Sequence, residues 1–182
     1  TYSIPQIFIK GAPLILIALG LSVGFKANVW NIGAEGQYIM GAIFGASFAL
    51  SLYPLESIFI FPTMILMGIL GGSLWSMIPA LLKVKFNVNE ILVSLMLVYV
   101  AEQFLALASL GFLRNPDGAG FPGSRNLSQY SSAANSELIM GTGIHLGVLL
   151  SLLMVVFFYV LLFKHSLGFK IKLLGNSPKA SG

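Results

Sequence analysis

Long apolar runs separated by short polar segments make up most of this chain. Three of the runs contain no charged residue, and they extend over 36–55, 57–82 and 138–163. A helix needs about 20 apolar residues to cross the ~30 Å hydrocarbon core of a membrane, and each run reaches that length. The pattern therefore predicts transmembrane helices rather than the helices of a water-soluble domain.

Of two further runs, one contains a charged residue and the other is shorter than a full span. The run 91–113 is interrupted only by Glu102, which lies near its centre. The run 11–25 has 15 residues and falls short of a full span, so it needs to borrow Ile7–Ile9 while the Lys10 side chain extends to the membrane surface. With these two runs the sequence predicts an all-α polytopic bundle of about five spans, in a single transmembrane domain over 1–182.

The composition agrees with a membrane protein. The chain has 182 residues, of which 57% are hydrophobic and 9% are charged, whereas about 25% are charged in a typical soluble domain. Its mean hydropathy is +0.90. A chain so poor in charge is solvated mainly by lipid, and we expect membrane lipid to be one of its partners.

The charged residues also exclude several function classes. The net charge is +4, but the basic residues lie singly between apolar runs and form no nucleic-acid-binding patch. There is no cysteine, and His145 and His165 have no partner at a metal-ligand spacing. No phosphate-binding loop or hydrolase motif is present. We therefore expect neither an enzyme nor a chain that binds nucleic acid, a metal or a cofactor.

The distribution of Lys and Arg predicts the orientation in the membrane. One set of connections between the runs holds seven basic residues: Lys26, Lys83, Lys85, Lys164, Lys170, Lys172 and Lys179. The other set holds three: Lys10, Arg114 and Arg125. Because basic residues concentrate on the cytoplasmic side, the segment 164–182 is expected inside and the segment 114–137 outside. The outer segment is too long for a simple turn, and we expect it to fold back as a short helix or a lid.

Three glycine pairs with a spacing of four residues predict close helix packing. They are Gly20/Gly24, Gly41/Gly45 and Gly68/Gly72.

A polar segment, NVWNIGAEGQYIMG at 28–41, opens the second apolar run. If Asn31 caps a helix, Glu35 lies one turn in, and Asn31, Glu35 and Tyr38 share one face by spacings of four and three residues. A helix N-terminus favours a carboxylate in its first turn, so Glu35 has a purely local explanation.

Glu35 also has a functional explanation. If Lys26 marks the inner membrane surface and the chain continues as a helix, Glu35 lies roughly 13 Å deeper. A carboxylate at that depth is expected to face a cavity or a partner rather than lipid. Gly33 and Gly36 permit a broken backbone, which is typical of transport sites. The residues alone leave both explanations open.

Three motifs follow one another along the chain. They are NIGAEGQ at 31–37, PALLKVKFNVNE at 79–90 with the run ILVSLML after it, and LGFKIKLLGNSPKA at 167–180. They resemble the motifs of permease subunits of ABC importers for nucleosides and simple sugars, in the superfamily of ribose and branched-chain amino acid permeases. The sequence departs from the family pattern at Val98, where asparagine is usual, and at Leu173, Ser177 and Ser181 in the third motif.

The resemblance assigns roles to the residues within the motifs. With the polar segment, it implies a substrate pathway at Asn31, Gly33, Glu35, Gly36, Gln37 and Tyr38. It implies a cytoplasmic ATPase-coupling loop over 164–182, with Gly168, Lys172, Gly175, Asn176, Pro178 and Ala180.

Three further residues have two interpretations each. Asn89 and Glu90 fit a helix cap with an acid in the first turn, and the family match favours a coupling role as well. Glu102 is either a neutralised carboxylate of the helix bundle or a second pathway group, and the family pattern does not distinguish these.

The resemblance also implies partners and a location. Such a permease lies in the cytoplasmic (inner) membrane of a prokaryote and pairs with a second permease chain as a homodimer or heterodimer. A separate ATP-binding subunit uses ATP, and an extracytoplasmic solute-binding protein delivers the solute, for which a nucleoside is our first choice and a simple sugar the second. Family members have about twice as many spans, so we expect this chain to be a fragment of a longer permease.

Two alternatives belong to other classes. A secondary transporter would use Glu35 and Glu102 as proton or sodium sites, and a membrane scaffold would carry no solute. The importer is favoured over both, because a secondary transporter has no need of a docking segment for an ATPase and a scaffold has no need of buried carboxylates.

The predicted orientation can be tested by labelling. Because the chain has no cysteine, Ser124→Cys and Ser166→Cys each introduce a single thiol. An impermeant thiol reagent added to intact cells should label the first variant and leave the second unlabelled until the cells are opened. Labelling of the second variant alone from outside would invert the topology.

Overall fold

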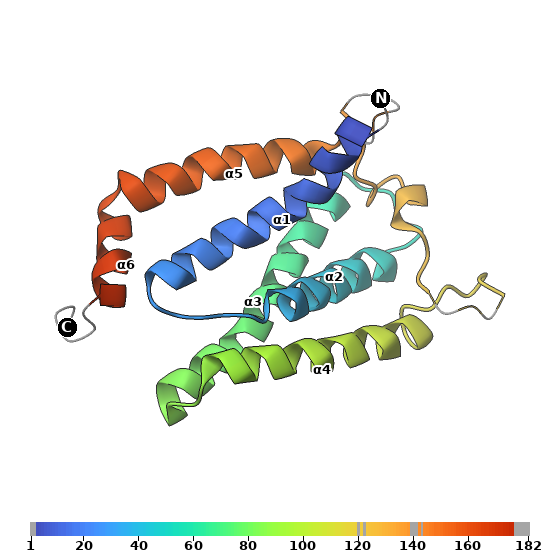
Figure 1. The fold of residues 1–182 in the computed structure, drawn as a ribbon. Helices are drawn as coiled ribbons and strands as arrows, with labels where there is room; N and C mark the ends of the chain where they lie inside the picture. The colour runs from blue at the N-terminus through green and yellow to red at the C-terminus, as the bar shows by residue number, and fades with distance from the viewer. Residues whose placement is uncertain (1–2, 120, 122, 139–141, 143, 177–182) are drawn as a thin grey trace. The chain divides into compact units, whose positions relative to one another are not determined.

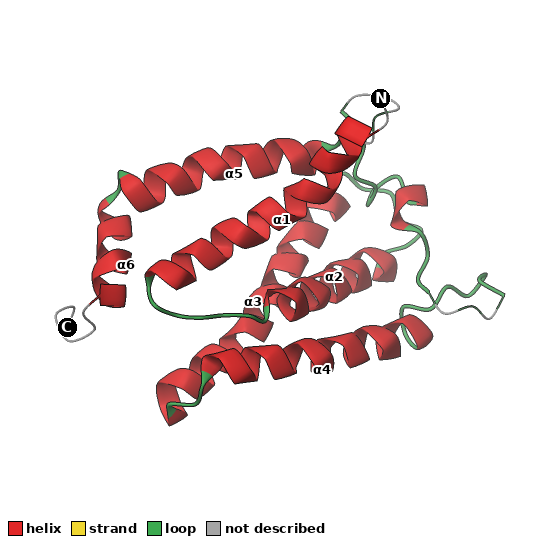
Figure 2. Ribbon diagram, in the orientation of Figure 1, coloured by secondary structure: helices red, strands yellow, loops and turns green. Residues whose placement is uncertain are grey.

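The computed structural model describes residues 3–119, 121, 123–138, 142 and 144–176. In this part of the chain the secondary structure is helical, without any strand, which confirms the all-α prediction (Figures 1 and 2). The helices are α1 (Ser3–Lys26), α2 (Ala34–Ser51), α3 (Ile60–Phe86), α4 (Glu90–Leu110), the 3-10 turn η1 (Leu127–Gln129), α5 (Leu146–Phe163) and α6 (Ser166–Asn176).

Four of the described helices, α1, α3, α4 and α5, are long and apolar enough to cross a membrane. Each predicted run thus contains a helix, but α2 is not among the four. It has 18 residues, and the polar side chains Glu35 and Gln37 fall in its first turn. The first helix is longer than its apolar run, because it continues through Pro13 and begins at Ser3.

The chain divides into two compact units, which are described separately. The central unit comprises 32–134 with α2, α3, α4 and η1, and the terminal unit comprises 1–31 and 135–182 with α1, α5 and α6.

In the central unit, α2 packs against both α3 and α4 (Figure 1). Buried apolar side chains from α2, from α4 and from the turn after α4 form its main cluster: Met40, Ile43, Ala101, Ala108 and Leu113. The partly buried Trp75 ring of α3 packs against this cluster and meets Phe104 edge-on, with 5.9 Å between ring centroids. The centre of this unit is therefore α2.

Glycines hold α2 and α3 at backbone distance. A Cβ atom built on Gly41 would lie 2.9 Å from the carbonyl oxygen of Gly68, and one on Gly45 would lie 3.1 Å from that of Met64. The sequence pairs Gly41/Gly45 and Gly68/Gly72 thus make the close helix contact that their spacing predicts. The third pair does not, since a Cβ on Gly20 meets nothing within 4 Å and one on Gly24 meets only the carbonyl of Val29.

The long segment after α4 folds back onto the turn between α2 and α3. Tyr130 packs with Ala49, Ile60 and Ala133, and its hydroxyl donates a hydrogen bond to the carbonyl oxygen of Leu55. Burial raises the pKa of Tyr130, and the carboxylate of Glu56 acts in the same direction. The hydroxyl therefore stays protonated, as a donor, at neutral pH. The expected short helix is the single turn η1.

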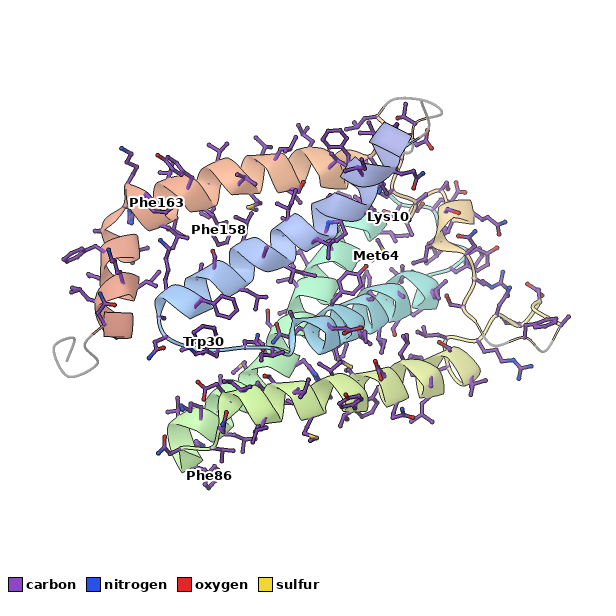
Figure 3. All side chains as sticks on the ribbon, in the orientation of Figure 1. Lys10, Trp30, Met64, Phe86, Phe158 and Phe163 are labelled. Atoms are coloured by element: carbon purple, nitrogen blue, oxygen red, sulfur yellow. The ribbon has the colours of Figure 1, made fainter. Side chains whose placement is uncertain are left out.

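In the terminal unit, α1 packs along α5, and α6 packs on both. The ammonium group of Lys26 lies 4.0 Å from the centroid of the Phe163 ring, so the last turns of α1 and α5 are adjacent. Apolar side chains project from several sides of α5, where Phe158 and Phe163 are labelled (Figure 3). A helix that is apolar all round suits a lipid environment.

The glycine contact generates a stability test. We expect Gly41→Ala to destabilise the protein relative to Gly20→Ala by about 1–3 kcal/mol, the usual range for overpacking. Both variants gain the same helix propensity of about 1 kcal/mol, so their difference isolates the clash with Gly68. Thermal unfolding of the purified protein in lipid measures this difference. Equal melting temperatures for the two variants would contradict the close contact.

Candidate functional site

The first candidate site lies where α2 begins. Gly33 is the N-cap and Ala34 the first helical residue, so Glu35 lies in the first turn as expected. Asn31 does not cap the helix, and the predicted shared face with Asn31 is therefore wrong, because that residue lies outside the helical repeat. Glu35 and Tyr38 remain three residues apart on α2, and both side chains are exposed.

Ser94 fixes the point at which α2 begins. The backbone N–H of Ile32 donates to the Ser94 hydroxyl at 3.2 Å, and that hydroxyl donates to the carbonyl of Ile91 at 3.1 Å. A Cβ atom on Gly33 would lie 2.7 Å from the Ser94 carbonyl oxygen, so glycine alone fits there. Ser94 is 1% exposed and was not singled out from the sequence, because its partner is 62 residues away along the chain.

Gly36 continues the same contact one turn later. A Cβ at this position would lie 3.1 Å from Cα of Val98 and 3.3 Å from Nε1 of Trp75. The beginning of α2 is therefore wedged between the backbone of α4 and a side chain of α3. The Trp75 indole nitrogen is buried and has no hydrogen-bond partner within the described residues. A free donor thus lies beside the first turn of α2.

The contacts with α3 place Glu35 at depth. A Cβ on Gly72 would lie 3.2 Å from the carbonyl oxygen of Gln37, and Gly72 is near the middle of α3. Since α3 is long enough to span the membrane, α2 begins close to mid-depth. The sequence analysis also expected Glu35 at depth, but it assumed a continuous helix from Lys26. That assumption is wrong, because α1 ends at Lys26 and the chain is not helical again until Ala34.

A second carboxylate lies on the same unit. Glu102 is one turn beyond Val98 on α4, about 6 Å along the axis from the contact with Gly36. It is exposed on the surface of the central unit, as is Tyr99, three residues earlier. Neither the ion pairs nor the hydrogen bonds of the described residues include Glu102. Both interpretations of Glu102, as a carboxylate of the helix bundle and as a pathway group, therefore stay predictions.

Asn89 and Glu90 have structural roles at the start of α4. The Asn89 side chain caps the helix by accepting from the N–H of Ile91 at 3.0 Å. Glu90 forms an ion pair with Lys83 of α3, with 2.8 Å between Oε2 and Nζ. These two interactions link the end of α3 to the start of α4, and they confirm the capping interpretation.

The third motif forms a helix where a loop was expected. Residues Ser166–Asn176 are α6, so Gly175 lies within a helix and not in a loop. Its glycines serve packing: a Cβ on Gly168 would collide with the carbonyls of Leu161 and Leu162, and one on Gly175 would overlap the carbonyl oxygen of Lys26. Pro178 and Ala180 lie outside the described residues.

Polar and basic side chains of α6 are exposed beside apolar ones such as Phe169. Lys172 and Asn176 are exposed, as is Lys170. A groove of about 440 Å³ lies between the ends of α1 and α5 and the first turns of α6, lined in part by Lys26, Lys164 and Lys172. This end of the terminal unit is cationic, which fits the prediction that it faces the cytoplasm.

The family comparison agrees with these features. The chain belongs to the family described as the branched-chain amino acid transport system / permease component, whose model matches residues 3–182. This confirms the resemblance carried by the three motifs. With its apolar helices, the chain is a multi-pass protein of the cytoplasmic membrane.

Relatives of known name are sugar and nucleoside permeases. The chain is 31% identical to a glucose ABC transporter permease of Haloferax volcanii, over 99% of this chain and 49% of the relative. It is 28% identical to a nucleoside ABC transporter permease of Lactococcus lactis and 26% identical to a guanosine ABC transporter permease of Bacillus subtilis, in each case over 93% of this chain and 48% of the relative. The chain thus spans about half the length of the curated relatives it matches. No solved structure matches it.

Proposed function

We propose that this chain is part of the permease subunit of an ATP-binding-cassette importer and contributes the pathway for a nucleoside or a simple sugar. Membership of the permease family supports the class, and the names of the relatives support the solute. ATP hydrolysis belongs to a separate subunit. The names of the relatives favour the importer over the secondary transporter and the scaffold, since all three relatives described above are ABC permeases.

One observation carries the pathway proposal: α2 begins at mid-depth with an exposed carboxylate in its first turn. A helix end at that depth needs polar surroundings, because its free N–H groups and the charge of Glu35 are costly in hydrocarbon. A solute pathway supplies such surroundings. Broken helices whose ends point at the solute are a recurring device of transport proteins.

The chemistry of the site suits a neutral solute rich in hydroxyl groups. Glu35 accepts hydrogen bonds from ribose hydroxyls or base N–H groups, each worth roughly 1.5–3 kcal/mol when one partner is charged. Tyr38 adds an exposed ring and a hydroxyl on the same side of α2. Glu102 and Tyr99 are further exposed polar groups, three residues apart on α4.

The partners follow from the class. A second permease chain would complete the pathway against the exposed surface of the central unit, and a solute-binding protein would dock at the 114–137 side. The ATP-binding subunit would contact the exposed side of α6, through Lys172 and Asn176, and the segment that holds Pro178 and Ala180. In this proposal Gly168 and Gly175 act indirectly, by letting α6 pack closely enough to present that surface.

Replacing Glu35 tests the pathway. Glu35→Gln keeps the volume and one acceptor but removes the charge, so we expect uptake of the transported nucleoside or sugar to fall about tenfold or more, since ~1.4 kcal/mol is a factor of ten. Protein abundance should change little. Solute uptake beside a quantitative blot measures both. Glu56→Gln is the matched control, because Glu56 is an exposed carboxylate beyond the end of α2. Near-normal uptake in Glu35→Gln would leave only the local role at the helix end.

Reversing one charge tests the coupling surface. We expect Lys172→Glu in the full-length permease to lower co-purification of the ATP-binding subunit and uptake together, because it places a carboxylate on the docking side of α6. Lys10→Glu, at an exposed lysine of α1, should affect neither. Gly175→Val is unsuitable, since the clash with Lys26 would damage packing. Unchanged co-purification and transport in Lys172→Glu would refute this surface.

A further inference from the structure

A small polar cavity lies in the central unit, at the end of α2 that is remote from Glu35. Its volume is about 200 Å³. We call it the tyrosine cavity, and its polar lining comes from Tyr53, Asn115, Asp117, Arg125, Asn126 and Gln129. By the charge distribution of the sequence it opens on the extracytoplasmic side.

The walls of the tyrosine cavity are held rigidly. The Tyr53 ring meets the buried Tyr130 ring edge-on, with centroids 5.3 Å apart, and Tyr130 is itself tied to the carbonyl of Leu55. The Arg125 guanidinium lies 4.4 Å from the Tyr53 centroid and forms an ion pair with Asp117 at 2.8 Å. The backbone N–H of Asn115 donates to the carbonyl of Gly123 at 2.8 Å, which holds these two residues of the segment after α4 close together.

Several hydrogen-bonding groups in this lining have no partner among the described residues. The side-chain oxygen of Asn115 accepts from the N–H of Asp117, and that of Asn126 accepts from Ser128, so both amide NH₂ groups remain available. The Gln129 side chain makes no hydrogen bond in this part of the chain. The amides of Asn115 and Asn126 are each held through the oxygen, so their NH₂ groups can donate to a ligand beside the aromatic rings without rearranging.

Charge and size restrict the ligand. Arg125 and Asp117 neutralise each other, so the cavity offers no net charge to an anion or a cation. Its volume is below the ~300–1,000 Å³ typical of sites for drug-sized ligands. A neutral ring bearing adjacent hydroxyl groups fits both limits, because hydroxyls pair with amides and the C–H face of the ring packs on tyrosine.

We propose that the tyrosine cavity is an entry subsite that binds the sugar ring of the solute before it reaches the pathway at Glu35. This inference rests on the proposed function for the class of solute. The ligand is the part that simple sugars and nucleosides share, a neutral ring with vicinal hydroxyls. The side chains that hydrogen-bond those hydroxyls are Gln129, Asn115 and Asn126.

Direct binding tests the subsite without transport. The full-length permease in lipid nanodiscs, without ATP or partner proteins, is titrated with D-glucose, D-ribose and uridine and followed by saturation-transfer NMR. L-Valine, which is zwitterionic and lacks hydroxyls, is the control ligand. We expect millimolar binding of at least one sugar-bearing probe and none of L-valine. Gln129→Ala should weaken that binding about two- to tenfold, as for loss of one or two neutral hydrogen bonds.

Two further variants separate this proposal from the pathway proposal. Gln6→Ala, a glutamine of α1 in the terminal unit, should bind like the unaltered protein. Glu35→Gln should keep the binding that depends on Gln129, whatever its effect on uptake. Absence of sugar binding, equal binding in Gln129→Ala, or binding of L-valine that depends on Gln129 would each overturn the subsite.

Discussion

The direct contact of α2 with two neighbouring backbones is the constraint on which the central unit depends. Helices normally lie 8–10 Å apart because side chains separate them. Glycines remove those side chains at Gly33 and Gly36 toward α4 and at Gly41 toward α3. The reward is close packing in an environment where water supplies no driving force for association. The cost is that α2 has no freedom to shift along either neighbour.

This constraint sets the chemistry of the candidate site. Because Gln37 lies against Gly72, the first turn of α2 is fixed near the middle of α3 and cannot move to the membrane surface. Glu35 is consequently exposed at depth. The local role of a carboxylate at a helix end and its role in a solute pathway are then not exclusive, since the same helix dipole that favours Glu35 also favours a polar solute beside it.

Sequence reasoning succeeded where a property is local to a segment. Run length and hydropathy locate the spanning helices, and the spacing of Gly41/Gly45 and Gly68/Gly72 indicates which faces meet. It failed where a contact with a residue far along the chain determines the local structure. Asn31 is a good capping residue, but the bond from Ile32 to Ser94 and the fit of Gly33 against α4 move the cap to Gly33. Likewise the third motif was expected to be a loop, whereas the contact of Gly175 with the end of α1 makes Gly175 the small residue of a packed helix.

The weak hydropathy of α2 has a consequence for how the protein is made. The polar groups of its first turn and its many small residues leave it outside the set of helices apolar enough to cross a membrane alone. Its neighbour α3 is in that set and follows after a short connection at 52–59. Glu35 and Gln37 in the first turn of α2 account for much of its low hydropathy, because ionisable and amide side chains are costly in hydrocarbon. The translocation machinery therefore has to accept α2 and α3 as one hairpin, in which the later helix carries the earlier one into the bilayer.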